Sequence, residues 1–190
     1  MDVVLASGSP RRANILSQMG VSYRVVNSQM KEDKPSNPYC VWVQDLAYQK
    51  ARTVASSTGE IILAADTVVV RKEDVLGKPI DKTEAKKMLS LLSGDVHEVM
   101  TGICVINAIT GQVFKDVEIT KVYFRILTEQ EIEKYIQSEE PFDKAGAYGI
   151  QGLGGLLVEK IEGCYYNVMG LPMVKTMNLF RKCGIKILGG

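Results

Sequence analysis

The sequence contains only one histidine, His97, and its four cysteines include no Cys-x-x-Cys pair. A zinc site built on several imidazoles is therefore excluded. The cysteines lie far apart in a chain that is long enough to bury a core without disulfides, so we expect reduced thiols. Any divalent metal must then be held by oxygen ligands, which favours magnesium or manganese.

An excess of charge of one sign and long apolar runs are also missing. Lys and Arg number 23 and Asp and Glu number 22, which gives a net charge of +1 and no general basis for binding a nucleic acid backbone. No apolar run approaches the roughly 20 residues that cross a membrane, and the N-terminus lacks the basic and apolar regions of a signal peptide. We therefore expect a cytoplasmic protein with no nucleic acid and no membrane as partner.

The composition and the periodicity of the apolar residues predict one α/β domain over residues 1–190. Hydrophobic residues make up 46% and charged residues 24% of the chain, as in ordinary globular domains. Helices and strands alternate, and one long hairpin lies among them, so we expect a mixed β-sheet flanked by helices. The predicted strands are 3–6, 61–70, 96–107, 113–127 and 156–161. The predicted helices are 10–19, 39–56, 81–92, 128–137 and 171–182, and Asp81/Glu84 and Thr128/Glu131 are capping boxes.

Asp66 is the most informative position, because it interrupts a strand whose other residues are almost all apolar. An ionised carboxylate inside such a strand is costly unless a metal or a cation meets it. The alternative is a carboxylate at a strand end that caps a neighbouring amide. We predict that Asp66→Asn removes turnover but leaves a folded protein of nearly normal or higher thermal stability, because a buried carboxylate clustered with another acid is strained without its metal.

A second candidate site is the segment from Ser7 to Arg12, where a strand turns through glycine into a helix. The amides at such a helix N-terminus bind anions, and phosphate suits a bidentate arginine. Arg11 and Arg12 oppose the helix dipole, a conflict that a bound anion would relieve. The alternative is a pair of solvated arginines after an ordinary N-cap. The segment is not a P-loop, because the Walker spacing and lysine are absent.

Several other residues are candidates of lower specificity. The glycine-dense loop at 143–155 suits close approach to a flat ligand, and Gln151 is its residue best able to recognise a base edge. The alternative is a set of turns that binds nothing. Lys50 and Lys78 are either phosphate ligands or surface lysines, and Glu32 is a possible second metal ligand. His97 is more typical of a structural strand histidine than of a catalytic base.

Five motifs, taken together and in this order, closely resemble the Maf family of nucleoside triphosphate pyrophosphatases from residue 3 to about residue 180. They are residues 5–12 (LASGSPRR), 64–69 (AADTVV), 77–79 (GKP), 143–152 (DKAGAYGIQG) and 168–172 (VMGLP). The resemblance implies an elongated mixed sheet with a central cleft between two lobes, similar to the inosine triphosphate pyrophosphatases. It also implies metal-dependent hydrolysis of a nucleoside triphosphate to the monophosphate and pyrophosphate, by a homodimer.

The resemblance also implies roles for individual residues. Asp66 corresponds to the catalytic proton acceptor close to the metal, with Lys50 and Lys78 as catalytic cations. Glu32 corresponds to a second acidic group at the metal, a role that Asp33 can share. Ser7 and Arg12, like the two lysines, correspond to positions that hold the triphosphate.

The base preference implied by the resemblance depends on Arg11, Thr67 and Gln151, which match the branch acting on dTTP and UTP. A related branch acting on 7-methyl-GTP commonly has Trp, Gln and Glu at these positions. A cationic methylated purine favours an aromatic face and a carboxylate, whereas a neutral pyrimidine pairs with an amide. The alternatives are a pyrophosphatase for 7-methyl-GTP or another modified purine, and a nucleotide-binding regulator of septum formation.

Overall fold

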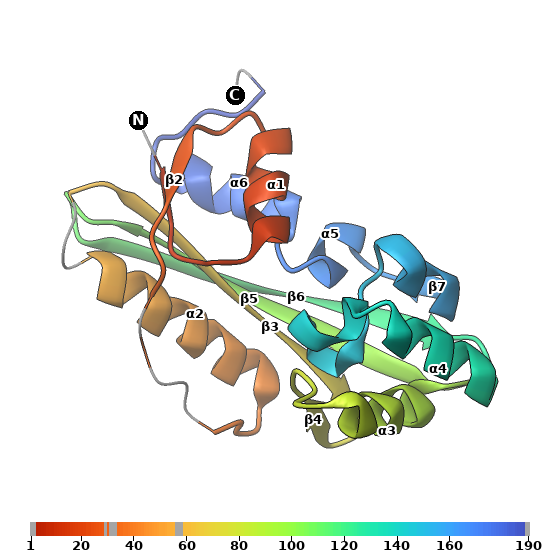
Figure 1. Ribbon diagram of the computed structural model, residues 1–190. Helices are drawn as coiled ribbons and strands as arrows, with labels where there is room; N and C mark the ends of the chain where they lie inside the picture. Colours follow the sequence, from red (N-terminus) through yellow and green to blue (C-terminus); the bar gives the residue numbers. More distant parts are fainter. Residues whose placement is uncertain (1–2, 29, 31–33, 56–58, 189–190) are drawn as a thin grey trace. The chain divides into compact units, whose positions relative to one another are not determined.

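The computed structural model describes residues 3–28, 30, 34–55 and 59–188, and its centre is a seven-stranded mixed β-sheet (Figure 1). The strands follow the order β2-β1-β3-β5-β6-β7, and β4 pairs with β3 outside this path. β1 runs parallel to β2 and β3, whereas the pairs β3–β4 and β6–β7 are antiparallel. The predicted α/β class is confirmed. The strands are β1 (Val3–Leu5), β2 (Tyr23–Val25), β3 (Ile61–Arg71), β4 (Asp74–Leu76), β5 (Val96–Asn107), β6 (Gln112–Phe124) and β7 (Val158–Glu162).

The described residues also form six α-helices and three short 3-10 helices. None of the helices in the described part of the chain is long and apolar enough to cross a membrane. The α-helices are α1 (Pro10–Gln18), α2 (Tyr39–Ala55), α3 (Lys82–Leu92), α4 (Glu129–Gln137), α5 (Tyr165–Val168) and α6 (Met173–Lys182). The 3-10 helices are η1 (Glu140–Asp143), η2 (Ala145–Ala147) and η3 (Gly152–Leu157).

The chain divides into two compact units, and the division falls inside strands β3, β5 and β6. Unit 1 comprises Met1–Asp66, Thr101–Glu118 and Gly170–Gly190. Unit 2 comprises Thr67–Met100 and Ile119–Met169. Each unit has its own apolar core.

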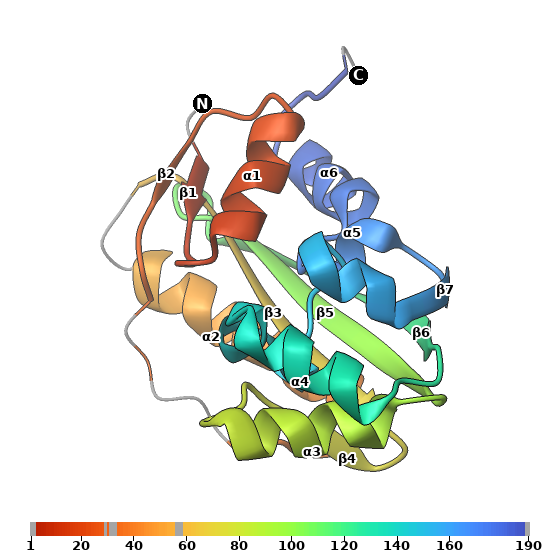
Figure 2. The same ribbon diagram turned by 45° about the vertical axis from the view of Figure 1, so that its right-hand side comes forward.

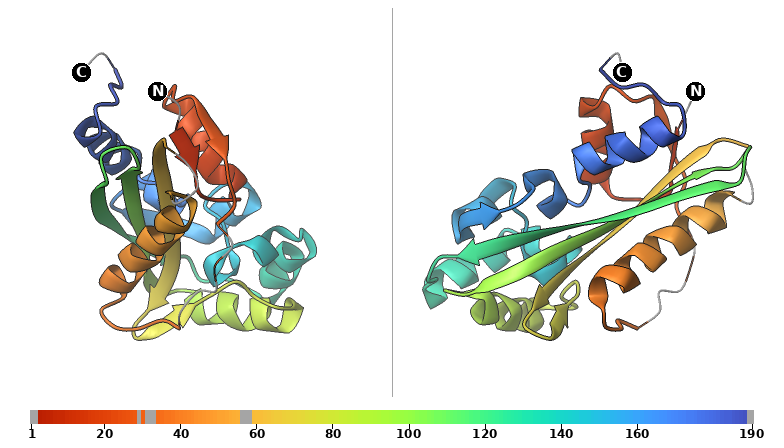
Figure 3. Two further views of the ribbon diagram at one scale, coloured as in Figure 1. Left: turned by 90° about the vertical axis from the view of Figure 1, so that its left-hand side faces the viewer. Right: turned by 180° about the vertical axis from the view of Figure 1, so that it is seen from behind.

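In unit 1, helix α2 covers one face of the sheet, and α1 and α6 lie on the opposite face (Figure 3). The core beneath α2 joins Val4 of β1, Ala64 of β3 and Cys104 of β5 to Ala47 and Ala51 of the helix. Small side chains on both surfaces allow a close approach. The contact is closest at Gly102, where an added Cβ would lie 2.3 Å from the carbonyl oxygen of Val43. Glycine is therefore required at this crossing of β5 and α2.

In unit 2, α3 and α4 lie side by side (Figure 2) and contribute to one apolar core. A buried aromatic group, His97, Phe124 and Tyr148, belongs to the same unit, and its rings meet edge to face. The His97 Nε2 atom and the Tyr148 hydroxyl are hydrogen-bonded at 2.7 Å. Burial lowers the pKa of His97 to about 4. These contacts agree with the interpretation of His97 as a structural residue.

The capping residues predicted at three helix N-termini form their expected side-chain hydrogen bonds completely, in part or not at all. Thr128 and Glu131 form the complete capping box that was predicted. Asp81 accepts a bond from the Glu84 amide, but the Glu84 carboxylate accepts from Ile80 rather than from Asp81. Ser9 occupies the N-cap position of α1 without a side-chain capping bond. All four cysteines are free thiols, and all four lie in the described part of the chain.

Candidate functional site

Arg12 joins two of the predicted motifs within unit 1. Its Nη1 atom donates to the hydroxyl oxygen of Ser7 at 3.0 Å, and its Nε atom donates to the carbonyl oxygen of Gly170 at 2.8 Å. The rigid fork of a guanidinium suits two acceptors in different directions. Arg12 thus fixes the direction of the Ser7 hydroxyl, and Ser7 as a whole is buried, with 8% of its surface exposed. The role of the Gly170 carbonyl was not predicted, although the surrounding motif was recognised.

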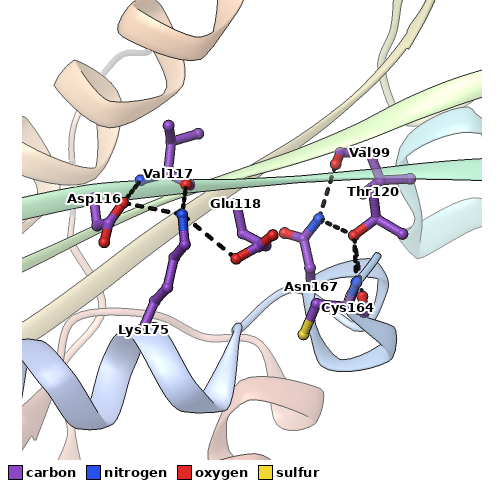
Figure 4. Close-up of polar contacts among 8 residues, drawn as sticks. All are labelled: Val99, Asp116, Val117, Glu118, Thr120, Cys164, Asn167 and Lys175. Atoms are coloured by element: carbon purple, nitrogen blue, oxygen red, sulfur yellow. Dashed lines mark hydrogen bonds and ion pairs between the residues drawn. The ribbon is translucent and has the colours of Figure 1, made fainter. Parts of the chain in front are cut away.

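Helix α6, which begins after Gly170-Leu171-Pro172, is attached to β6 by Lys175 (Figure 4). The ammonium group of Lys175 contacts the carboxylates of Asp116 at 3.2 Å and Glu118 at 3.4 Å, and it donates to the carbonyl of Val117. These residues all belong to unit 1. Lys175 therefore anchors the first turns of α6, directly after the carbonyl that Arg12 binds.

In unit 2, the one-turn helix α5 is held by Asn167, whose side chain is fully buried (Figure 4). Its Nδ2 atom donates to the Val99 carbonyl and to the Thr120 hydroxyl oxygen, both at 2.9 Å. The Thr120 hydroxyl oxygen also accepts a bond from the Cys164 amide at 3.0 Å. The segment before Met169 is thus attached to β5 and β6 by hydrogen bonds that no local sequence pattern predicts.

Asp66 and Lys50 form an ion pair in unit 1. The carboxylate comes from β3 and the ammonium group from α2, and the two side chains are only 12% and 13% exposed. A mostly buried carboxylate needs a compensating charge, and Lys50 supplies it. The structure thus brings two candidate residues together in an ion pair that the sequence did not predict, and Lys50 is not an ordinary surface lysine.

Ser7 and Asp66 both follow the last paired residues at the carboxyl end of the parallel strand pair β1–β3. β1 and β3 pair with Leu5 beside Leu63, and the Ala6 amide donates to the Leu63 carbonyl at 2.8 Å. Ser7 follows that register by two residues and Asp66 by three. Ligands of open α/β sheets bind outside the carboxyl ends of parallel strands. The register thus places both predicted residues at the end of the strand pair where such ligands bind.

Unit 2 brings the turn that carries Lys78 against the glycine-dense loop. The Gly146 amide donates to the Gly77 carbonyl at 3.0 Å. Gly146 has a φ of 70°, and a Cβ added there would lie only 3.1 Å from a methyl carbon of Val69. Lys78 is exposed, and Thr67 is half-buried in the first position of β3 that belongs to this unit. The loop is therefore an ordered structure with defined neighbours.

Gln151, the candidate for base recognition, is exposed at the start of η3 in unit 2. Its side chain does not cap the turn that follows. Arg11, the charged residue among the candidates for base preference, is half-buried in the first turn of α1 in unit 1. Glu32 and Asp33, the predicted second metal ligand and its substitute, lie outside the described residues.

The carboxylate of Asp66 is an oxygen donor of the kind that magnesium and manganese prefer. The described residues contain no group of three or more His, Cys, Asp or Glu side chains that could hold a metal ion. Asp66 thus fits a metal as one ligand only, and the rest of the predicted ligand set lies in the segment around Glu32.

Comparison with known proteins gives the family. The family model described as Maf-like protein matches residues 2–183. The chain belongs to the Maf family. Among its curated relatives, each named dTTP/UTP pyrophosphatase, the protein of Halalkalibacterium halodurans is 50% identical over 96% of both chains. That of Clostridium perfringens is 47% identical over 99% of this chain and 100% of its own, and that of Acetivibrio thermocellus is 45% identical over 98% and 97%.

Solved structures similar to this Maf protein include a dITP/XTP pyrophosphatase from Mycobacterium abscessus and a HAM1 protein from Coxiella burnetii. The first is 18% identical with a TM-score of 0.46, and it covers 65% of this chain and 74% of its own. The second is 17% identical with a TM-score of 0.48, and it covers 65% and 73%.

Proposed function

We propose that this Maf protein hydrolyses dTTP and UTP to the nucleoside monophosphate and pyrophosphate. The observation that carries the proposal is the mostly buried pair of Asp66 and Lys50, beside the end of the strand pair from which Ser7 emerges. A fold gains little from such a pair, whereas a hydrolase needs a proton acceptor beside a cation. The curated relatives named dTTP/UTP pyrophosphatase support the substrate.

In the proposed reaction, Asp66 accepts a proton from the water that attacks the α-phosphorus. The new bond joins the water oxygen to the α-phosphorus, and the bond from that phosphorus to the oxygen bridging to the β-phosphorus breaks. The leaving pyrophosphate carries the electron pair of that bond. Lys50 and Lys78 stabilise the charge that develops on it, and Ser7 and Arg12 hold the triphosphate. The Arg12 contact supports this role, because it fixes the direction of the Ser7 hydroxyl.

We propose Mg²⁺ or Mn²⁺ as the cofactor, with Asp66 and Glu32 as ligands and Asp33 able to share the role of Glu32. When bound, the cation supplies positive charge that polarises phosphate oxygens. The carboxylate chemistry of Asp66 supports this assignment. Omission of the divalent cation, with a chelator present, should abolish turnover.

The products and the labelled atom test the reaction. Hydrolysis in ¹⁸O-labelled water should place the label in the monophosphate and release unlabelled pyrophosphate, because the water oxygen becomes bonded to the α-phosphorus. Release of inorganic phosphate and a diphosphate would contradict the proposal, as would label in the pyrophosphate. Nucleotide binding without any turnover would favour the alternative of a nucleotide-binding regulator.

We further propose that Arg11, Thr67 and Gln151 set the preference for pyrimidines. kcat/KM for dTTP and UTP should exceed that for 7-methyl-GTP by at least about tenfold. The triple variant Arg11→Trp, Thr67→Gln, Gln151→Glu should reduce or invert this ratio, because the new aromatic ring and carboxylate suit a cationic base. A wild-type preference for 7-methyl-GTP would favour the modified-purine alternative.

We also propose a cytoplasmic homodimer. The mass in solution, measured by light scattering after size-exclusion chromatography, tests the dimer. A monomer at the concentration of the activity assay would contradict it.

A further inference from the structure

The loop that carries Gln151 is held on both sides by two residues of unit 2, Tyr135 and Glu140. On the side before Gln151, the Gly149 amide donates to the Tyr135 hydroxyl oxygen at 3.3 Å. On the side after it, the amides of Leu153 and Gly154 donate to the two carboxylate oxygens of Glu140, at 3.1 and 3.3 Å. Gln151 itself lies between these attachments.

The two attachments are themselves joined. The Tyr135 hydroxyl is hydrogen-bonded to Glu140, and burial together with this carboxylate raises the pKa of Tyr135. Lys144 donates to the backbone carbonyl of Glu140 at 2.5 Å, which fixes the backbone from which the carboxylate extends. The Glu140 carboxylate thus accepts hydrogen bonds from two loop amides, and it also contacts the Tyr135 hydroxyl, which accepts the hydrogen bond of the third loop amide, that of Gly149.

The glycines of the loop fit this carboxylate closely. Gly152 has a φ of 70°, and an added Cβ would lie 2.7 Å from the Glu140 Oε1 atom. A Cβ at Gly154 would lie 2.6 Å from the Tyr135 hydroxyl oxygen and 2.2 Å from the Gly149 carbonyl oxygen. The glycine density of this segment is therefore explained by close contact with Glu140 and Tyr135, as well as by any contact with a ligand.

We propose that Glu140 is a positioning residue for base selectivity, since its carboxylate fixes the backbone that presents the Gln151 amide. This inference rests on the proposed function, and specifically on Gln151 as a base-recognising residue. An amide side chain distinguishes donor and acceptor patterns only if its backbone is held in one place. Glu140 acts through the loop and not through contact with the substrate.

The first test is independent of activity. Glu140→Gln keeps the shape but replaces one acceptor oxygen by an NH₂ group that faces a backbone amide. Hydrogen exchange at the Leu153 and Gly154 amides should accelerate by at least about tenfold, because both lose a charge-assisted bond. The control is Glu159→Gln, an exposed glutamate of β7 in the same unit. Unchanged exchange in Glu140→Gln would overturn the proposal whatever the enzyme hydrolyses.

The second test separates positioning from a general structural role. In Glu140→Gln, the ratio of kcat/KM for dTTP to that for 7-methyl-GTP should fall by at least about threefold. In a Gln151→Ala background the same change should leave the ratio unaltered, because the residue through which Glu140 acts is gone. An equal loss for both nucleotides, or the same fall in both backgrounds, would overturn the proposal.

Glu140→Asp provides the same comparison if the glutamine variant does not fold. It retains the charge but shortens the side chain by one methylene, so it should give a smaller fall in the ratio, again only when Gln151 is present. Absence of pyrophosphate release from dTTP by the wild-type protein would instead contradict the proposed function, while the exchange measurement would still decide whether Glu140 holds the loop.

Discussion

At the scale of single residues, the pairing of Asp66 with Lys50 changes what a substitution should do. The sequence suggested that Asp66 is clustered with another acid, in which case its neutralisation would spare the fold. In the structure its neighbour is the ammonium group of Lys50, and both side chains are mostly buried. Removing one charge from such a pair leaves the other without compensation.

Asp66→Asn should therefore lower both activity and stability. We expect turnover of dTTP to fall by at least about a hundredfold, because the proton acceptor is lost. We expect the free energy of unfolding to fall by about 1–3 kcal/mol, because Lys50 stays mostly buried opposite a neutral amide. Steady-state kinetics and urea unfolding measure the two effects.

The matched control is Asp74→Asn, which neutralises an exposed carboxylate of β4. It should leave both quantities nearly unchanged. A stable Asp66→Asn variant with wild-type turnover would show that the carboxylate is neither the proton acceptor nor the partner of Lys50.

His97 gives the protein a predictable sensitivity to acid. Its pKa is lowered from 6.5 to about 4 in the folded protein by burial, so the unfolded chain binds a proton at a higher pH than the folded chain does. Unfolding then takes up a proton between these values, and stability falls as the pH falls from about 6.5 to about 4. Above pH 6.5 the residue is neutral in both states and contributes no pH dependence.

Replacing His97 by Gln should remove this part of the acid sensitivity. Between pH 7 and pH 4 the wild-type protein should lose about 3 kcal/mol more stability than the variant, as a shift of this size implies. Glutamine can still bond to the Tyr148 hydroxyl but does not titrate in this range. Urea unfolding at a series of pH values measures the difference, and parallel pH profiles for the two proteins would contradict the assignment.

At the scale of elements, the crossing of β5 and α2 depends on Gly102. An added methyl group would overlap the backbone of Val43, and a helix backbone cannot move aside as a flexible side chain can. Gly102→Ala should therefore destabilise the protein by about 3 kcal/mol, at the upper end of the usual cost of overpacking.

Thermal or urea unfolding measures this effect. Gly59→Ala is the control, because an added Cβ there would meet no atom within 4 Å. If the two variants are equally stable, α2 does not approach β5 as closely as described.

The sequence predicted those elements whose signals are local. The long strands and helices of 61–71, 96–107 and 39–55 and the capping box of Thr128 needed only apolar periodicity and the chemistry of neighbouring residues. Strands β2 and β4 and helix α5 were missed, because three or four residues are too short to show a period. The 3-10 turns of 140–157 were predicted only as an irregular glycine-rich loop.

The candidate site was predicted residue by residue, but its internal contacts were not. The ion pair of Lys50 and Asp66 joins a helix to a strand, and the bond from Arg12 to Gly170 spans 158 residues. Such pairs depend on tertiary packing, which produces no periodic pattern in the sequence. Glu140 lies three residues before a recognised motif, and a pair of glutamates before a proline does not indicate which groups they contact.

At the scale of the whole molecule, the two units share three strands. This sharing is the physical reason to expect that residues 1–190 unfold as one domain. Because β3, β5 and β6 each continue from one unit into the other, neither unit can lose its strands without affecting the other. Scanning calorimetry should show one transition, with calorimetric and van't Hoff enthalpies in agreement. Two resolved transitions would show that the units unfold independently.

The order of the segments has a consequence for synthesis on the ribosome. Unit 1 begins at the N-terminus but also contains the segment that starts at Gly170. Arg12 can therefore bond to the Gly170 carbonyl only after 158 further residues have been synthesised. At translation rates of about 5–20 residues per second this delay is roughly 8–30 s. A multidomain chain usually completes its N-terminal domain first, whereas here the unit that is begun first is the last to be finished. The nascent chain therefore carries strand β1 and the arginines of α1 in an incomplete unit for most of its synthesis.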